Sequence, residues 1–351
     1  MIRPLTSLRF FFALMVFVSH LGFVHPQAPW FAQVYAQVFK EGYIGVSFFF
    51  ILSGFILAYT YQQRMHTGEV SPRQFWVARF ARIYPLFFLT LLLAIPLSMR
   101  EFLQDAGYWA GRLLCNVSLT HAFVPSQDFF FSFNAPSWSI SDEAFFYALF
   151  PGLVWLLGRS TGRWLWWGIL ALVPLGMLVM PAFLHHPLFY INPVFRVADF
   201  LLGILLFECF QAGRGQQWFR SPAWATACEA AATGLFVLFF VLHPLIGQVW
   251  RYSVYYWIPM AVIIYVFAHQ KGALSRVLSA PLLVLGGEIS FGLYLIHQLV
   301  MRYYVSLSQR AGVDLPPWLV VLLVLGITLL ASYLSYRWVE KPCNRYIKKR
   351  F

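Results

Sequence analysis

Long apolar stretches, separated by short polar segments, recur along the whole chain. Four of them approach the length needed to cross a bilayer, namely residues 43–61, 164–184, 252–268 and 315–336. A helix needs about 20 apolar residues to span the hydrocarbon core. The pattern therefore predicts an all-α integral membrane protein.

Six further stretches are apolar but carry polar residues: 6–24, 82–99, 138–157, 189–208, 225–243 and 279–302. Polar side chains are tolerated within a span when they face the interior of a helix bundle. We therefore expect one membrane domain, residues 1–351, with about ten transmembrane helices. Its single long outer loop is expected at about 100–136.

The composition agrees with this pattern. Hydrophobic residues make up 60% of the 351 positions and charged residues only 11%, against about one quarter in a typical soluble domain. The formal net charge of +12 does not require a nucleic acid partner, because membrane proteins collect Lys and Arg in their cytoplasmic loops. We expect contact with membrane lipid and no binding of nucleic acid.

The basic residues are unevenly divided between alternate loops. With a cytoplasmic N-terminus, 17 of the 25 Lys and Arg residues fall on inner segments. Six fall in outer loops: Lys40, Arg100, Arg112, Arg251, Arg302 and Arg310. The positive-inside rule then places both termini in the cytoplasm. An even number of spans, such as ten, is required for that arrangement.

No metal site is expected from the cysteines and histidines. The four cysteines, Cys115, Cys209, Cys228 and Cys343, are widely scattered and form no paired motif, unlike a zinc site or a disulfide framework. Six histidines fall in loops or at helix ends, where solvated or interfacial side chains are expected: His66, His121, His185, His186, His243 and His269.

Arg9 and His20 are ionisable residues within the first predicted span. Such residues cost on the order of 2.5–3.5 kcal/mol to insert, so each is a candidate functional residue. Eleven residues at about 100° each bring both side chains to nearly the same helix face, roughly 16 Å apart along the axis. Taken alone, Arg9 is equally well explained by snorkelling, and His20 by a bond to a neighbouring helix.

Arg79 and Arg82 lie three residues apart near the predicted start of the third span. Residues at this spacing share a helix face, and two guanidinium groups together bind phosphate groups well. Taken alone, the pair is better explained by ordinary positive-inside charge.

The fourth span begins with a polar segment, residues 136–143. Ser137 or Ser139 is suited to cap the helix, and Asp142 then serves as the carboxylate typical of a helix start. Glu143 lies deeper and, on the outer side, is a candidate partner for the His20 imidazole.

Two further spans carry polar groups. Arg196 and Asp199, three residues apart, are best explained as a structural ion pair buried between helices. The ninth span carries Ser290, Tyr294 and His297, which are expected to line a cavity, beside glycines that favour close helix packing.

Six sequence elements together resemble the acyltransferase family three, multi-pass bacterial enzymes that modify surface glycans. They are Arg9 with His20 after ten residues, Gly45 to Phe55, Arg79 with Arg82, Trp138 to Tyr147, Ser290 to His297, and Glu340 to Pro342. The resemblance spans nearly the whole chain and has all six elements in the family's order.

The resemblance implies an inner-membrane enzyme that moves an acyl group, acetyl above all, from cytoplasmic acyl-CoA to a hydroxyl of an extracytoplasmic glycan or glycoside. It implies that Arg79, Arg82 and Arg9 hold the nucleotide phosphates of acyl-CoA. It makes His20 the general base or the site of an acyl-histidine intermediate. Glu143 is then the group that orients His20 or stabilises its charged form.

The expected substrate-pocket residues are Trp138, Ser139, Ser141, Tyr294 and His297. The acceptor stays open, as do the length of the acyl group and the participation of a separate periplasmic partner protein. A transporter or flippase of a glycan or small anionic solute is the alternative function. Such proteins are typically built from internal repeats, and the sequence shows none.

Overall fold

The computed structural model describes residues 2–24, 29–157 and 162–350, which form helices and no β-strand. This confirms the all-α prediction. The helices of ten or more residues are α1 (Arg3–Ser19), α3 (Gly45–Leu57), α5 (Pro72–Ala94), α7 (Ala106–Val117), α9 (Trp138–Leu157), α10 (Gly162–Val179), α12 (Pro193–Gln211), α13 (Pro222–Leu242), α15 (Val254–Ala268), α17 (Pro281–Ala311), α18 (Pro317–Ser335) and α19 (Lys341–Arg350).

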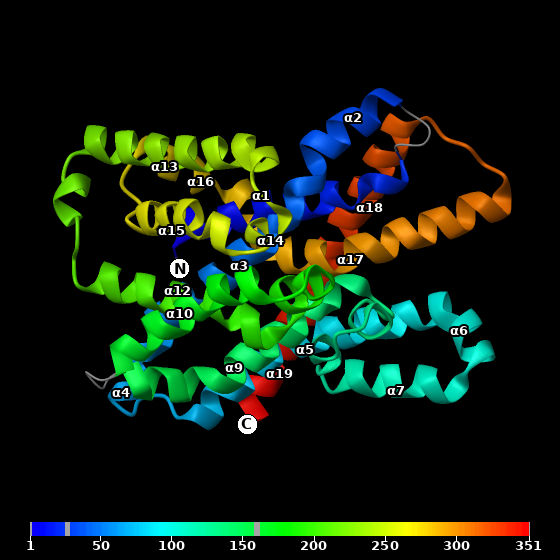
Figure 1. Cartoon of the computed structure of the whole chain (residues 1–351), viewed down its shortest axis with the longest axis horizontal. Coiled ribbons are helices and arrows are strands. Elements are labelled where there is room, and N and C mark those ends of the chain that lie inside the picture. The colour runs from blue at the N-terminus through cyan, green and yellow to red at the C-terminus, as the bar shows by residue number, and fades with distance from the viewer. Residues whose placement is uncertain (1, 25–28, 158–161, 351) are drawn as a thin grey trace. The chain divides into compact units, whose positions relative to one another are not determined.

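Short helical segments connect these helices (Figure 1). They are η1 (Leu21–Phe23), α2 (Pro29–Gln37), η3 (Phe39–Ile44), η4 (Ala58–Gln62), α4 (Gln63–His66), η5 (Ile95–Ser98), α6 (Met99–Gln104), η6 (His121–Phe123), α8 (Gln127–Phe130), η7 (Ala135–Ser137), α11 (Ala182–His185), η8 (His186–Ile191), η9 (Gln216–Phe219), η10 (His243–Leu245), α14 (Gln248–Arg251), α16 (Ala273–Leu278) and η11 (Tyr336–Glu340).

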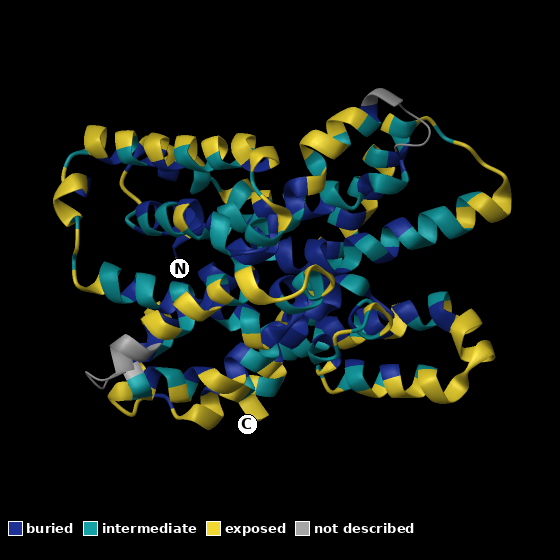
Figure 2. Cartoon of the chain, in the orientation of Figure 1, coloured by how far each residue is buried: buried dark blue, intermediate teal, exposed yellow. Residues whose placement is uncertain are grey.

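Several described helical segments are long and apolar enough to cross a membrane. Six meet this criterion by length and composition: 3–23, 31–66, 72–104, 222–245, 281–311 and 317–350. Helix α13 has mostly exposed residues (Figure 2), among them Val237, Leu238 and Val241. Exposed apolar side chains along a helix of this length suit contact with lipid hydrocarbon. The protein is therefore a membrane protein.

Helix boundaries agree with the predicted spans unevenly. Helix α9 covers the predicted 138–157, whereas α5 begins at Pro72 rather than at residue 82. The Gln74 backbone N–H donates to Ser71 Oγ at 3.2 Å, and the Ser71 N–H donates to Gln74 Oε1 at 2.9 Å. These reciprocal bonds form a capping box that starts α5 early. Arg79 and Arg82 consequently lie well inside a helix.

The chain divides into two compact units. Unit 1 consists of residues 1–12, 44–75 and 145–288, and unit 2 of residues 13–43, 76–144 and 289–351. The division passes through α1, α5, α9 and α17, so these four helices contribute residues to both units.

In unit 1, α3 and α12 pack with their backbones in close contact. A Cβ atom on Gly54 would overlap the Phe200 carbonyl, and one on Gly203 would overlap the Ile51 carbonyl. Small residues allow such close approach between membrane helices. Figure 1 shows α13, α15 and α16 of the same unit lying near one another.

The predicted ion pair of Arg196 and Asp199 is confirmed in unit 1. Arg196 Nη2 lies 2.9 Å from Asp199 Oδ2, and both side chains are almost completely buried. The same guanidinium donates to Ser47 Oγ at 2.9 Å and to the Tyr252 carbonyl at 2.5 Å. Its carbon also lies 5.0 Å from the centre of the Phe50 ring.

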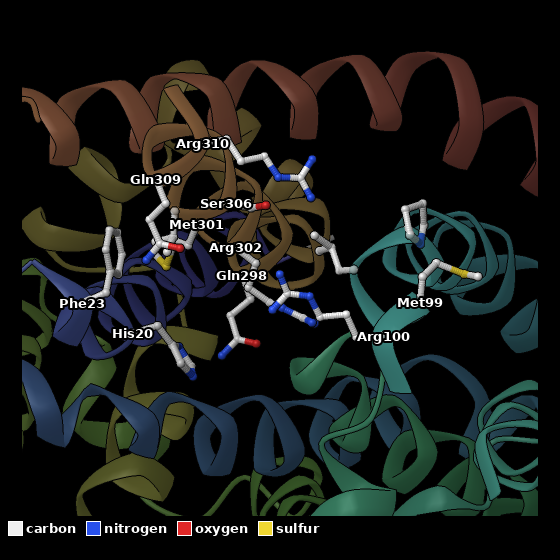
Figure 3. Close-up of a pocket in the computed structure, with 13 residues that line it drawn as sticks. His20, Phe23, Met99, Arg100, Gln298, Met301, Arg302, Ser306, Gln309 and Arg310 are labelled. Carbon is white, nitrogen blue, oxygen red and sulfur yellow. The ribbon is translucent and has the colours of Figure 1, made fainter. Parts of the chain in front are cut away.

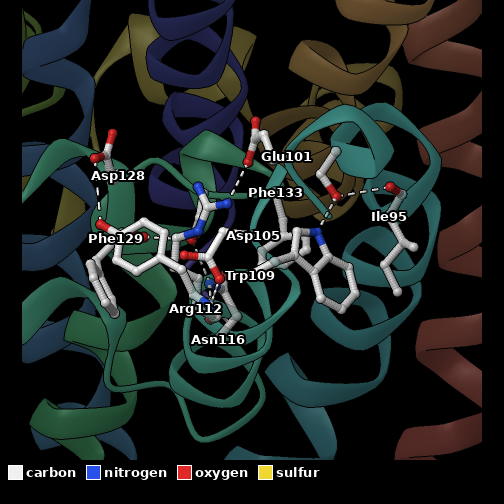
Figure 4. A network of polar contacts seen from close by, with 12 residues as sticks. Ile95, Glu101, Asp105, Trp109, Arg112, Asn116, Asp128, Phe129 and Phe133 are labelled. Atoms are coloured by element: carbon white, nitrogen blue, oxygen red, sulfur yellow. Dashed lines mark hydrogen bonds and ion pairs between the residues drawn. The ribbon is translucent and has the colours of Figure 1, made fainter. Parts of the chain in front are cut away.

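In unit 2, the predicted outer loop at 100–136 is largely helical, because polar contacts hold its segments together (Figure 4). Asp105 accepts a hydrogen bond from the Tyr108 N–H at 2.8 Å and caps α7. Arg112 pairs with Glu101 at 2.8 Å, which joins α7 to α6. Asn116 donates to Ser132 Oγ at 2.7 Å. These contacts position Met99 and Arg100 at the start of α6.

Candidate active site

His20 follows the last residue of α1 and precedes η1. Its Nδ1 lies 2.9 Å from the Val16 carbonyl oxygen and 3.1 Å from His297 Nε2. A carbonyl oxygen only accepts hydrogen bonds, so the pattern assigns the proton of neutral His20 to Nδ1. Nε2 of His20 is then the unprotonated nitrogen, which can act as a base.

His297 in α17 is the partner imidazole, and its side chain is completely buried. Its Nδ1 lies 2.7 Å from the Tyr294 carbonyl and 3.1 Å from the Leu293 carbonyl. This assigns a proton to His297 Nδ1 and a lone pair to Nε2, which accepts from His20. The main chain of α17 thus fixes His297, and His297 helps to fix the tautomer of His20.

His20 also lines a cavity of about 770 Å³ within unit 2. Volumes of roughly 300–1,000 Å³ are typical of sites for small ligands. Three arginines share this cavity, Arg100 from α6 and Arg302 and Arg310 from α17. In Figure 3 the side chains of Arg100 and Arg302 extend toward one another, with Arg310 above them and His20 below and to the left.

A second group of basic residues lies elsewhere in unit 2. Arg82 Nη1 is 2.5 Å from Glu340 Oε2, whose side chain is only 3% exposed. Lys348 lies close enough to Arg79 and Arg82 for its charge to be repelled by both. The cluster therefore combines three cations with the Glu340 carboxylate, and guanidinium groups of this kind bind phosphate.

Comparison with known proteins identifies the family. A family model described as "Acyltransferase domain" matches residues 5–337. This chain belongs to the acyltransferase family three. The protein is therefore an acyltransferase, which confirms the enzyme class predicted from the sequence.

Two curated relatives of this acyltransferase illustrate the similarity. Acyltransferase MdmB from Streptomyces mycarofaciens is 31% identical, over 99% of this chain and 92% of that protein. O-acetyltransferase OatA from Staphylococcus aureus is 23% identical, over 99% of this chain and 58% of that protein. The acyltransferase therefore spans little more than half the length of OatA. No solved structure matches it.

The substrate-pocket roles predicted for five residues of the acyltransferase stay predictions. The five predicted residues are buried and none lines the cavity beside His20: Trp138, Ser139, Ser141, Tyr294 and His297. Ser141 donates to the Leu119 carbonyl at 2.6 Å, whereas Ser139 and Tyr294 both donate to the Pro136 carbonyl at 3.1 Å. Their hydroxyls satisfy main-chain carbonyls in a buried region, so they position the start of α9 against its neighbours.

Ser137, predicted as a possible cap of α9, instead contacts His121 Nε2 at 3.3 Å. His121 was expected to be solvated or interfacial, but it is completely buried, and burial lowers its pKa to about 4. His243 is likewise buried. Chain position alone did not show that the loop folds over His121.

The roles predicted for Glu143 and Arg9 stay predictions. Glu143 is half-buried in α9, and Arg9 is half-buried in the part of α1 that belongs to unit 1. The hydrogen-bond partners found for His20 among the described residues are Val16 and His297. Sequence reasoning had assigned His297 to the pocket wall. The position of His297 in the Ser290 to His297 element was the sequence signal for its contact with His20.

The described residues include no group of three or more His, Cys, Asp or Glu side chains placed to hold a metal ion. The chemistry available at the cavity is that of an imidazole base with nearby guanidinium groups. This combination suits proton transfer from a hydroxyl group.

Proposed function

We propose that this acyltransferase transfers an acetyl group from cytoplasmic acetyl-CoA to a hydroxyl of an extracytoplasmic glycan. The observation that carries the proposal is His20 on the wall of a ligand-sized cavity, with its imidazole bonded to the buried His297. The name of the relative OatA, an O-acetyltransferase, supports O-acetyl transfer. The membrane character supports a reaction between a donor on one side and an acceptor on the other.

In the proposed reaction, His20 Nε2 takes the proton of the acceptor hydroxyl while its oxygen attacks the thioester carbonyl carbon. The tetrahedral intermediate collapses, the carbon–sulfur bond breaks, and the imidazolium returns the proton to the departing thiolate. His297 accepts the Nδ1 hydrogen bond throughout, which keeps His20 in the tautomer with a basic Nε2. His297 is therefore a positioning residue, and Glu143 is proposed to stabilise the imidazolium.

The donor phosphates are proposed to bind at Arg79 and Arg82, with Lys348 as a third cation. The proximity of Lys348 to Arg79 and Arg82 supports this assignment, because such cations bind phosphate. The phosphate-binding role of Arg9 stays a prediction from the sequence. The Glu340 carboxylate already forms an ion pair with the Arg82 guanidinium. A bound phosphate must therefore share Arg82 with this carboxylate or displace it.

The proposed topology has ten transmembrane helices in a bacterial inner membrane, with both termini cytoplasmic. Beyond the six long apolar segments, the remaining four spans correspond to α9, α10, α12 and α15. Helix α15 has only 15 residues, and α12 carries Arg196, Asp199 and Glu208. Short length or charged residues keep such helices below the criterion of length and composition. Charged residues are tolerated in a span when they are buried within a helix bundle.

The test uses the purified protein in lipid nanodiscs with radiolabelled acetyl-CoA. The parent is expected to bind and slowly hydrolyse acetyl-CoA. His20→Ala should keep binding but lose turnover by about 100-fold to 10,000-fold, because proton transfer is lost. His185→Ala is the matched control, since His185 bonds to the Met180 carbonyl in unit 1 and does not line the His20 cavity.

His297→Gln tests positioning separately. It should lower turnover less than His20→Ala and shift its pH profile, with acetyl-CoA affinity unchanged. An active His20→Ala variant would refute the catalytic assignment. Failure of the parent to bind acetyl-CoA would instead refute the proposed donor.

A further inference from the structure

The cavity beside His20 is strongly basic. Arg100, Arg302, Arg310 and His20 line it, and its lining among the described residues contains no Asp or Glu. Glu101, next to Arg100 in sequence, has its carboxylate 2.8 Å from Arg112 and lies outside this lining. The Glu101 charge nevertheless acts on Arg302 from outside the lining, whereas Arg100 and Arg310 form no ion pair among the described residues.

The arginines are held on two structural supports. Arg302 donates to the Phe133 carbonyl, which uses one N–H of a group that has five. Arg310 lies in the last turn of α17, and Arg100 lies at the start of α6, which the Glu101–Arg112 pair ties to α7. Most guanidinium donors thus remain available on a largely preformed wall.

The rest of the lining suits a sugar. Gln298, Ser306 and Gln309 are polar side chains from the cavity face of α17, and Phe23 adds an aromatic ring from η1. Amide and hydroxyl groups can exchange hydrogen bonds with sugar hydroxyls. An aromatic ring beside polar groups is a common arrangement in ligand sites.

We infer that the acyl acceptor carries an oxyanion, a carboxylate or phosphate, that binds Arg100, Arg302 and Arg310 while a nearby hydroxyl faces His20. This deepens the proposed function, on which it rests, by assigning an acidic glycan as the substrate class. Guanidinium groups bind carboxylate and phosphate through paired, charge-assisted hydrogen bonds. An anion also offsets positive charge that is otherwise confined in one cavity.

The same oxyanion chemistry is present in the diphosphate of acetyl-CoA, so the test must separate the two sources. The probes are tetragalacturonate and its fully methyl-esterified form, which share a sugar skeleton and differ in charge. Binding of each probe to the protein in phosphatidylcholine nanodiscs is measured without donor. Binding of acetyl-CoA is measured separately in the same preparations.

The parent is expected to bind the acid at least about tenfold more tightly than the ester. The Arg100→Gln/Arg310→Gln variant should lose most of this preference, and adding Arg302→Gln should abolish it, with acetyl-CoA affinity unchanged throughout. Arg276→Gln is the matched control, because this exposed arginine of α16 lies outside the cavity. The double variant keeps Arg302 and its bond to Phe133, so it tests the inference if the triple variant does not fold.

Equal affinity of the parent for acid and ester would overturn the inference, as would a preference that survives the double and triple substitutions. Loss of acetyl-CoA affinity in these variants would overturn it too, because the arginines would then hold the donor phosphates. Failure of the proposed function appears differently, as absent acetyl-CoA binding or hydrolysis by the parent. Probe binding is read independently of both.

Discussion

Arg196 in unit 1 and the cavity arginines of unit 2 place the same chemical group in opposite settings. The Arg196 guanidinium is buried against Asp199, Ser47 and the Tyr252 carbonyl. Arg302 and Arg310 line a cavity of about 770 Å³ whose described lining holds no carboxylate. The charge of Arg196 is neutralised within the fold, whereas the cavity arginines can bind a ligand.

The comparison shows that a charge within a predicted span does not by itself indicate function. Burial of an ion costs several kcal/mol unless its partners are well placed. Asp199 supplies that compensation for Arg196, so removal of the arginine should affect folding. Removal of a cavity arginine without such a partner should weaken ligand binding much more than it lowers the stability of the fold.

The largest expected stability effect is that of Arg196→Met. It leaves Asp199 buried without its cation, so the free energy of unfolding should fall by about 3–5 kcal/mol. Equilibrium unfolding in mixed micelles, with the yield of folded protein, measures this. Arg310→Gln is the matched control, and its effect should stay within about 0.5 kcal/mol.

Equal destabilisation by these two substitutions would remove the distinction between the two settings. A double variant sharpens the test further. Arg196→Met/Asp199→Leu should recover much of the lost stability, because it removes both charges together.

The ion pair of Arg82 and Glu340 is an intermediate case, with side chains 27% and 3% exposed. Arg82→Gln leaves Glu340 buried without its charged partner, so unfolding should become easier by about 2–3 kcal/mol. A double-mutant cycle with Glu340→Gln measures the coupling in micelles. If the cycle gives no coupling energy, the pair does not contribute to the fold and Arg82 is freer to bind phosphate than its geometry indicates.

Two histidines differ in the same way, because His121 is completely buried whereas His20 lines the cavity. Burial lowers the folded-state pKa of His121 to about 4, below its ordinary value of about 6.5. The folded state thus favours the neutral imidazole. The neutral His121 imidazole therefore contributes stability that is complete above about pH 6.5 and is lost as the pH falls towards 4.

This lowering of the His121 pKa predicts a free energy of unfolding that is about 2 kcal/mol smaller at pH 5 than at pH 8. His121→Asn should remove that part of the pH dependence, whereas His185→Asn should retain it. The measurement is the unfolding midpoint of each variant across this pH range. An unchanged pH profile for His121→Asn would mean that His121 is accessible to protons in the folded protein.

Local sequence patterns determined the membrane class, the all-α fold and several helices. The predicted span 138–157 coincides with α9 because its polar start and apolar continuation are local signals. The capping box of Ser71 and Gln74 was equally local but was missed, so α5 was predicted to begin too late. The Arg196–Asp199 pair was predictable because its members lie three residues apart on one helix.

The candidate site depended on contacts that only tertiary structure could provide. His20 and His297 are distant in sequence, and their 3.1 Å contact follows from the packing of α17 near the end of α1. Arg100, Arg302 and Arg310 counted in the sequence only as outer-loop charges, until folding placed them around one cavity. Sequence determines which residues can carry charge or move a proton, because that chemistry belongs to each side chain. Tertiary structure decides which charges are neutralised and which remain available, because burial and pairing depend on neighbours from distant parts of the chain.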